Sequence, residues 1–281
     1  DALTQEKVFK AVKKLGYDDS AIARKISEKA PSSWGELKTE LLLCPMPEQK
    51  NLLQLDFMAE ILRGIQNYFN RHRNVTMNIS TWEPDDRSED NRPLLRRLNS
   101  VGGIILMGSP DEKLMSFLRR NAIRYVLLPN ELPNESANSI SSDDFSGGFR
   151  AAEYLIQKGF RKIGFLCGSS LALSHTMRKY GAMASTVEHL GIEAFEARTA
   201  HSSDNADIER CFIDWLESGT CPPALVTSHA AVAEVICRVL EARGMTCPRD
   251  LSLITFDSEV RLYSGVRISY FRTFPRELGR L

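Results

Sequence analysis

The sequence lacks any apolar run near the roughly 20 residues that a membrane-spanning helix requires. Its most apolar stretch, residues 103–107, has only the length of a buried strand. An excess of one charge is also missing, because 36 basic side chains balance 36 acidic ones. The first ten residues are charged and contain no signal-peptide core. We therefore expect a soluble cytoplasmic protein with no membrane partner, and the overall charge gives no signature of nucleic-acid binding.

The cysteines do not form a metal-binding or disulfide pattern. None of the six belongs to a C-x-x-C pair, and no histidine stands at zinc-ligand spacing from them: Cys44, Cys167, Cys211, Cys221, Cys237 and Cys247. Free cysteines in apolar runs behave as small hydrophobic residues. The pattern predicts reduced, structural thiols and no metal or cofactor.

Familiar catalytic motifs are absent as well. The sequence contains no G-x-S-x-G, no H-E-x-x-H, no G-x-x-x-x-G-K-[ST] and no G-x-G-x-x-G. The loop Gly168-Ser169-Ser170 follows an expected strand, but it has no second glycine and no base nearby in sequence. We expect that the protein is not an enzyme.

What the sequence does contain is a regular alternation of strands and helices over most of its 281 residues. The strands are short and apolar on both faces, which is typical of parallel strands covered by helices. Their number exceeds what one open sheet needs. The sequence therefore predicts an α/β protein with two doubly wound parallel-sheet lobes, with ligands expected beyond the carboxyl ends of the strands. Strands are expected near 39–46, 75–81, 102–108, 124–129, 138–141, 162–168, 194–199, 224–228 and 251–257, and helices near 56–72, 92–99, 111–121, 147–159, 176–190, 207–218 and 231–244.

The first thirty residues have a different character. A helix is expected over residues 4–15, ended by Gly16, and a second, very short helix over 21–26. Seven basic residues stand here against five acidic ones. By itself this mild bias favours a solvated helix face over a DNA contact.

Several motifs in this order resemble the lactose-repressor family of bacterial transcription regulators, over essentially the whole chain. Residues 4–26 are similar to the end of that family's helix-turn-helix headpiece and its hinge helix, and residues 143–168, 178–181, 248–257 and 277–279 to its core. The matching residues are Thr4, Lys7, Val8, Leu15, Gly16, Tyr17, Ala23, Asp143, Gly147, Gly148, Ala152, Leu155, Gly159, Arg161, Ile163, Gly168, Arg178, Gly181, Pro248, Asp250, Leu251, Ser252, Phe256, Asp257, Glu277, Leu278 and Gly279.

This resemblance implies a domain organisation. Residues 1–17 correspond to the end of the DNA-binding headpiece and 18–30 to the hinge helix and linker. Residues 38–159 form the N-terminal lobe of a type I periplasmic-binding-protein-like core, with a late return around 271–281. Residues 160–270 form the C-terminal lobe. The resemblance also implies that the family's headpiece begins before residue 1 and its core continues after residue 281.

The resemblance further implies DNA contacts from the hinge segment. Ile26 stands where the family inserts an apolar wedge into the minor groove of operator DNA. Ala23, Arg24 and Lys25 share its short helix, and Lys7 is a candidate phosphate contact, as is Lys10. The alternative is that Ile22 and Ile26 simply complete an amphipathic turn.

The resemblance implies an effector contact for Arg178, and positions at strand ends and a helix start make Asp257, His229 and Ser146 further candidates. The alternatives are a surface salt bridge for Arg178, a structural cap for Asp257 and an ordinary turn residue for His229. Three positions depart from the family. His229-Ala230 replaces an Asn-Asp pair that would grip a polyol, and Thr255 replaces a glycine. The effector, sugar or nucleoside-like, is therefore either unusual or absent.

The sequence thus favours a homodimeric DNA-binding regulator, a repressor by resemblance, controlled by a small effector between two lobes. A solute-binding protein of a transporter with the same lobes is the alternative. It would carry a secretion signal and no hinge segment, and residues 1–30 argue against it. A sugar-modifying enzyme on this fold lacks a candidate nucleophile or base.

Overall fold

The computed structural model describes residues 37–45, 56–72, 75–84, 88–129, 137–168, 172–257, 262–263 and 265–281. The first lobe is built on a five-stranded parallel sheet in the order β2-β1-β3-β4-β5. Its elements are β1 (Leu37–Cys44), α3 (Asp56–Arg71), β2 (Val75–Thr81), α4 (Ser88–Leu98), β3 (Gly103–Gly108), α5 (Glu112–Arg120), β4 (Tyr125–Leu128) and β5 (Asn138–Ser139).

The second lobe is built on another five-stranded parallel sheet, in the order β12-β9-β8-β6-β7. Between β9 and β12 in the sequence, β10 and β11 form a short antiparallel pair. The elements are α6 (Asp144–Gln157), β6 (Ile163–Cys167), α7 (Leu173–Leu190), the 3-10 turn η2 (Ile192–Ala194), β7 (Phe195–Thr199), α8 (Asn205–Glu217), β8 (Ala224–Thr227), α9 (Ala230–Ala242), β9 (Ser252–Asp257), β10 (Leu262–Tyr263), β11 (Val266–Arg267), β12 (Ser269–Arg272) and α10 (Pro275–Leu278).

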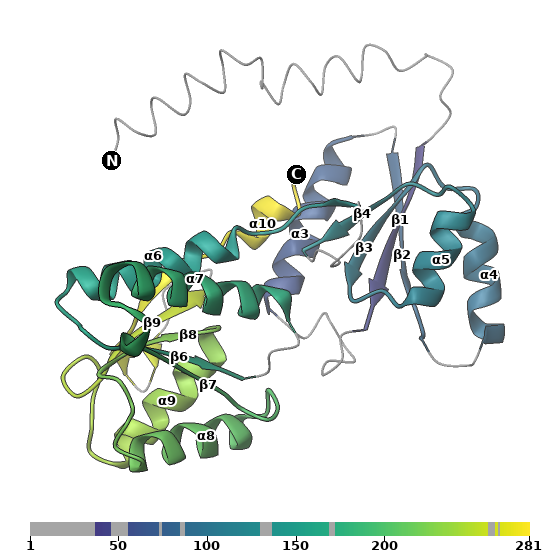
Figure 1. Ribbon diagram of the computed structural model, residues 1–281. Helices are drawn as coiled ribbons and strands as arrows, with labels where there is room; N and C mark the ends of the chain where they lie inside the picture. The colour runs from purple at the N-terminus through teal and green to yellow at the C-terminus, as the bar shows by residue number, and fades with distance from the viewer. Residues whose placement is uncertain are drawn as a thin grey trace, which may run out of the picture.

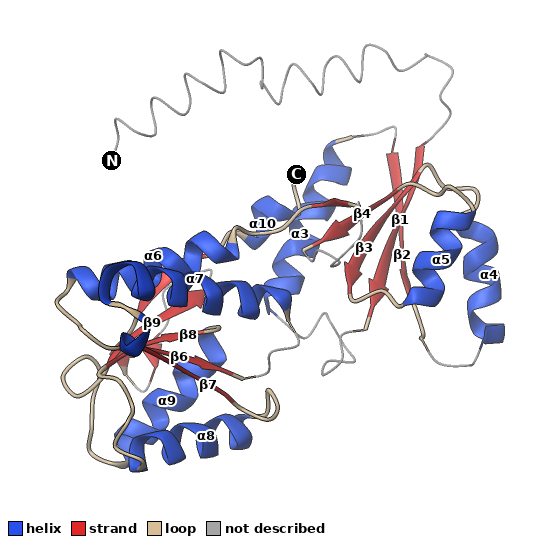
Figure 2. Cartoon of the chain, in the orientation of Figure 1, coloured by secondary structure: helices blue, strands red, loops and turns tan. Residues whose placement is uncertain are grey.

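Helices cover both faces of each sheet, so the central strands are apolar on both sides (Figure 1). In the first lobe α3 and α10 pack on one face, and α4 and α5 on the other. In the second lobe α6 and α7 share one face and α8 and α9 the opposite face (Figure 2). The expected two doubly wound lobes are therefore confirmed, and the reason is the double-sided burial that the short apolar strands require.

The chain ends by returning to the first lobe, where α10 packs on α3. Two glycines permit this contact. A Cβ on Gly279 would lie 2.1 Å from the carbonyl oxygen of Ile61, and one on Gly64 would lie 2.3 Å from that of Arg276. Arg276 also pairs with Glu60 across the two helices. The Glu-Leu-Gly motif at 277–279 thus serves backbone-to-backbone packing.

Two expected boundaries between the lobes differ from the structure. Residues 144–157 were assigned to the N-terminal lobe, within 38–159, yet Ala152 and Leu155 of α6 pack with Phe165 on the second sheet. The late return was expected from about 271, but β12 still pairs with β9. The chain therefore changes lobe at residues 140–143 and again at 273–274, because each adjoining element buries its apolar residues on a different sheet.

A buried carboxylate fixes α4 to the first sheet. Glu40 in β1 is fully buried and accepts from Arg97 Nη2 at 2.6 Å and from Arg97 Nε at 3.3 Å. Ser80 of β2 donates to the same carboxylate. The guanidinium of Arg97 remains 46% exposed, so the two charges are not equally removed from water.

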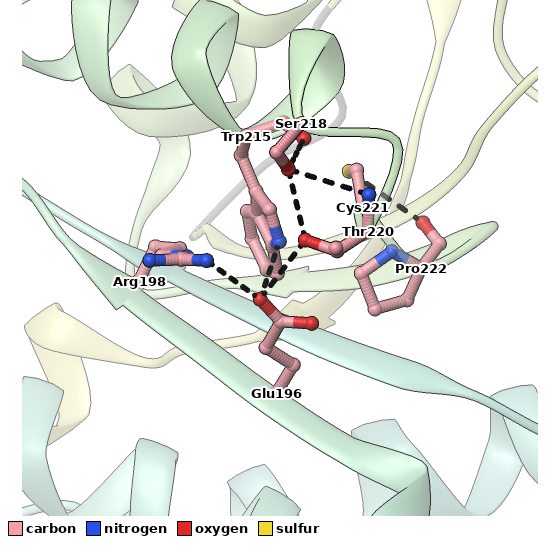
Figure 3. A network of polar contacts seen from close by, with 7 residues as sticks. All are labelled: Glu196, Arg198, Trp215, Ser218, Thr220, Cys221 and Pro222. Carbon is pink, nitrogen blue, oxygen red and sulfur yellow. Dashed lines mark hydrogen bonds and ion pairs between the residues drawn. The ribbon is translucent and has the colours of Figure 1, made fainter.

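Another carboxylate anchors the far edge of the second sheet (Figure 3). Glu196 Oε1 on β7 accepts from Trp215 Nε1 at 2.9 Å, Arg198 Nη2 at 3.0 Å and Thr220 Oγ1 at 3.3 Å. Ser218 Oγ lies 2.9 Å from Thr220 Oγ1. The network satisfies the buried indole of Trp215 and ties the end of α8 to the edge strand.

The unequal burial of Glu40 and Arg97 gives a stability prediction. Arg97→Met leaves a charged, buried Glu40 with Ser80 as its remaining partner, and we expect it to lower the free energy of unfolding by about 3 kcal/mol. Adding Glu40→Gln should recover part of that loss, because the unpaired charge is gone. Urea unfolding measures the free energy of unfolding of both variants.

Arg243→Met is the matched control, since its partner Glu217 is 66% exposed, and it should lower the free energy of unfolding by less than about 0.5 kcal/mol. Equal losses from Arg97→Met and Arg243→Met would contradict the prediction.

Candidate functional site

The second sheet has a point where its strand order reverses, between β6 and β8. From β6 the chain moves outward to β7, and from β7 it returns to the other side of β6 to form β8. As a result α7, which follows β6, lies on one face of the sheet, and α9, which follows β8, lies on the other. Ligands of doubly wound folds bind outside the carboxyl ends of the strands at such a point. Arg178 and His229, two of the expected effector contacts, lie here.

Helices α6 and α7 meet backbone to backbone beside this point. A Cβ on Gly148 would lie 2.0 Å from the carbonyl oxygen of Arg178, and one on Gly181 would lie 2.0 Å from that of Phe145. Real Cβ contacts are never so short, so both positions require glycine. The Gly pair that opens α6 and the R-x-x-G of α7 are therefore two sides of one helix crossing.

This crossing places the Arg178 side chain next to Asp144, at the start of α6. Arg178 Nε and Nη2 each lie 2.7 Å from Asp144 Oδ1, and Arg178 Nη1 donates to the carbonyl oxygen of Ser228 at 2.6 Å. The guanidinium carbon stands 4.4 Å from the centre of the Phe256 ring. Arg178 is 6% exposed, so it is neither a surface salt bridge nor a solvated side chain. It joins α6, α7 and the end of β8.

Two histidines stack at the same place. The rings of His175, in the first turn of α7, and His229, the residue before α9, are 4.7 Å apart and inclined by only 3°. Ser228 Oγ lies 2.9 Å from His229 Nδ1. Burial, the neighbouring His175 and then Arg178 lower the pKa of His229 to about 3. The imidazole of His229 is therefore neutral at neutral pH.

The threonine that replaces the family's glycine has a partner in the core. Thr227 Oγ1 donates to Thr255 Oγ1 at 2.8 Å, and both residues are fully buried between β8 and β9. Thr227 Oγ1 also lies 3.4 Å from the carbonyl oxygen of His229, so it has a second possible partner at the end of β8. This pair accounts for Thr255 by packing within the sheet.

The other two expected effector residues occupy separate positions. Asp257 ends β9, is 8% exposed, and its backbone carbonyl accepts from the amide of Thr273 at 2.7 Å. Ser146 lies in the first turn of α6, where its amide donates to Asp143 Oδ1 at 3.0 Å. Hydrogen bonds from the Ser146 side chain and amide lower the pKa of Asp143. Ser146 thus belongs to the N-terminal cap of α6.

The cysteines are free in the structure, as the absence of a pairing pattern predicted. Burial, with Asp111 as a smaller cause, raises the pKa of Cys44 to about 12, and burial with Glu196 raises that of Cys221 to about 12. Among the described residues, no cluster of three or more His, Cys, Asp or Glu side chains could hold a metal ion. In the same residues, no helix is both long and apolar enough to cross a membrane.

The expected DNA contacts Ile26, Ala23, Arg24, Lys25 and Lys7 lie outside the described residues, so the structure does not bear on them. The effector contacts Arg178, Asp257, Ser146 and His229 have positions but no ligand-binding role assigned by the geometry alone. They remain expectations at this point.

Comparisons with known proteins agree on one family. A family described as "Periplasmic binding protein-like domain" matches residues 152–281. The HTH-type transcriptional repressor PurR of Vibrio atlanticus is 25% identical over 280 residues, which are 99% of this chain and 80% of that protein. Catabolite control protein A of Priestia megaterium is 25% identical over 273 residues, 94% of this chain and 76% of the relative. The chain is thus similar to repressors and regulators of the lactose-repressor (LacI) type.

Solved structures of LacI-family regulators have the same fold. The transcription regulator CcpA of Lactococcus lactis superposes with a TM-score of 0.67 at 21% identity, covering 87% of this chain and 88% of that one. A CelR–cellobiose complex covers all of this chain and 82% of its own, with a TM-score of 0.67 at 18% identity. The two-lobed fold expected from the sequence is therefore confirmed.

Sequence reasoning missed His175, Asp144 and Ser228 at this site. His175 carries no motif, and it meets His229 only because β6 and β8, which are separate in the sequence, pair as neighbouring strands. Asp144 had a weak signal, because an acidic residue at the start of a helix is favoured by the helix dipole alone. Only the crossing of α6 and α7 shows that it pairs with Arg178.

The close crossing of α6 and α7 predicts that a methyl group added at Gly148 destabilises the protein more than one added at a glycine with free space around it. Gly148→Ala should force α6 away from α7 and lower the free energy of unfolding by about 1–3 kcal/mol, with displacement of Arg178 from Asp144. Gly103→Ala is the control, since its new Cβ would have its nearest neighbour at 3.9 Å. Thermal and urea unfolding compare the two variants. If Gly148→Ala were as stable as Gly103→Ala, the close crossing would be wrong.

The lowered pKa of His229 predicts acid sensitivity. The unfolded chain binds a proton at His229 below about pH 6.5, whereas the folded chain binds it only near pH 3. Stability contributed by this residue therefore falls as the pH drops from 6.5 towards 3, by about 2 kcal/mol at pH 5. His229→Asn should flatten the dependence of unfolding free energy on pH in that range. His201→Asn, at an exposed histidine, serves as the control and should keep the wild-type slope. Identical slopes in all three proteins would exclude the neutral buried state.

Proposed function

We propose that this chain is part of a LacI-type repressor that binds operator DNA as a homodimer and is released or retained by a small effector. The observation that carries the proposal is the match to PurR repressors over 99% of the chain, its first residues included. The two-lobed core supports it, since this family's core is shared by regulators solved with ribose and with cellobiose. The cytoplasm is the proposed location, because that is where operator DNA lies.

The effector site is proposed at the strand-order reversal of the second lobe, from Arg178, His229, Asp257 and Ser146. Two contacts support this assignment. Arg178 bonds to the carbonyl oxygen of Ser228 directly after β8, and His229, the next residue, stacks on His175 of α7. Asp257 ends the next strand and adjoins residues 273–274, where the chain changes lobe. A ligand that touches these residues would couple lobe arrangement to the DNA-binding segment.

DNA contacts are proposed for Ile26 as the minor-groove wedge, with Ala23, Arg24 and Lys25 on the same short helix and Lys7 on the helix before it. An isolated helix of about six residues is marginal in water, so we expect this segment to bind DNA as a helix only together with the rest of the dimer. Two such helices related by a two-fold axis would read a pseudo-palindromic site. The dimer therefore follows from the DNA geometry rather than from the core alone.

Binding of the full-length protein to DNA fragments near its own gene, at two salt concentrations, tests this proposal. We expect selective binding that weakens with salt. Ile26→Ala should reduce selective affinity about tenfold, or 1.4 kcal/mol, and leave non-selective binding nearly unchanged. Arg24→Ala should reduce the salt dependence by about one phosphate contact.

Lys162→Ala is the matched control, because it removes an exposed positive charge from the second lobe. It should leave both affinity and salt dependence at wild-type values. Absence of selective binding at low salt, together with tight capture of a sugar by the core, would favour the solute-binding alternative instead.

A further inference from the structure

A cavity of about 550 Å³ lies on the second lobe, between α6 and the edge strand β12. β12 pairs with β9 on one side, and on its other side the sheet has no further strand among the described residues. The cavity therefore opens at a lateral edge of the sheet. None of the four residues proposed for the effector site lines it. Its volume is in the range of pockets that hold small organic molecules.

The buried residues that line this cavity are apolar. Ala151 of α6, Ile254 of β9 and Ile268, directly before β12, are buried, and Phe271 of β12 is half-buried. The ring of Phe271 packs on that of Phe256 at a centre-to-centre distance of 5.6 Å, so the core of the sheet fixes its position. An apolar ligand body that displaces water from such a surface binds through the hydrophobic effect.

Two arginines stand at the exposed rim of the cavity. Arg150 of α6 and Arg267 of β11 both line it, and both are exposed. Neither forms a hydrogen bond or an ion pair with any residue that the structure describes. No acidic residue is among the described residues that line the cavity. Guanidinium groups with available donors are suited to forked hydrogen bonds with a carboxylate.

Aromatic and hydroxyl groups complete the rim. Tyr154 stands one helical turn after Arg150 and is 45% exposed, and the ammonium nitrogen of Lys158, a further turn along α6, lies 5.2 Å from the centre of its ring. Residues spaced by four share one face of a helix, so α6 carries a cation, a ring and a second cation along the side that borders the cavity. Tyr270 and Ser269 add two hydroxyl groups from β12.

We propose that this cavity is a ligand site separate from the proposed effector site, and that it binds a small organic anion, a carboxylate carried on an apolar or aromatic body. The carboxylate accepts hydrogen bonds from Arg150 and Arg267. The body covers the apolar surface of Ala151, Ile254 and Phe271. A neutral ligand leaves the two cations without a partner, and a carboxylate without an apolar body leaves the buried surface in water. The site goes beyond the regulator function proposed above and does not depend on it.

Calorimetric titration of the full-length protein tests this site. Benzoate and octanoate are the carboxylate probes, benzyl alcohol and octanol are their neutral analogues, and acetate is a carboxylate without an apolar body. We expect at least one of the two larger carboxylates to bind, with an affinity that falls as the salt concentration rises. Its neutral analogue and acetate should each bind at least tenfold more weakly.

Substitution of either arginine tests the location. Arg150→Met and Arg267→Met should each weaken binding of the carboxylate about 10- to 100-fold, as loss of one charge-assisted contact does. Both side chains are exposed, so both variants should fold, which thermal unfolding checks. Arg238→Met is the matched control, because Arg238 is exposed on α9, on the opposite face of the same sheet. It should bind the probe as wild type does.

Several outcomes would overturn the proposal. These are failure of both larger carboxylates, equal affinity for a carboxylate and its neutral analogue, binding that survives both arginine substitutions, and an equal loss in Arg238→Met. Binding of an extended peptide with alternating acidic and apolar residues, in place of the small carboxylates, would also overturn it. The free edge of β12 would then be a docking strand for another chain segment.

Discussion

The ion pair between Arg178 and Asp144 is the contact on which the candidate site depends. Its side chains are 8% and 12% exposed, so the charges have lost most of their hydration and need each other. The pair forms because Gly148 and Gly181 allow α6 and α7 to touch along their backbones. Through Ser228 the same guanidinium fixes the end of β8, and with it the residue that begins α9. One buried cation thus orders four elements.

Because the Arg178 guanidinium holds these elements together, its hydrogen-bond donors are not free to recognise a ligand in the usual way. An arginine at this position suits hydroxyls or a carboxylate of a ligand when its donors are available. Here the donors serve Asp144 and the β8 carbonyl, while a neutral imidazole stands where the family's polar pair would be. The departures at His229 and Thr255 then belong together. Both convert a polar, open strand end into one closed by internal hydrogen bonds and flat rings.

The order of strands and helices could be predicted from the sequence, since period and length report local burial. Strands were expected at residues 75–81 and 224–228, and the structure has β2 at Val75–Thr81 and β8 at Ala224–Thr227. The lobe of α6 could not be predicted, because an amphipathic helix between two strands fits either sheet. The strand β12 was missed because an edge strand of four residues with half-exposed side chains carries no alternation signal. At the site, Arg178 and His229 had motif positions, whereas His175 depended on a long-range neighbour.

The position of Asp257 links this site to the connection between the lobes. Its carbonyl accepts the amide of Thr273, the first residue after β12, and Phe274 then precedes α10 on the first lobe. Because α10 is held to α3 by backbone contact at Gly64 and Gly279, residues 273–274 cannot shift without either lobe following. The end of β9 is therefore hydrogen-bonded to the segment that joins the packing of the two lobes. Interfaces packed this tightly change between discrete arrangements rather than deforming gradually, which is what an effector-controlled regulator requires.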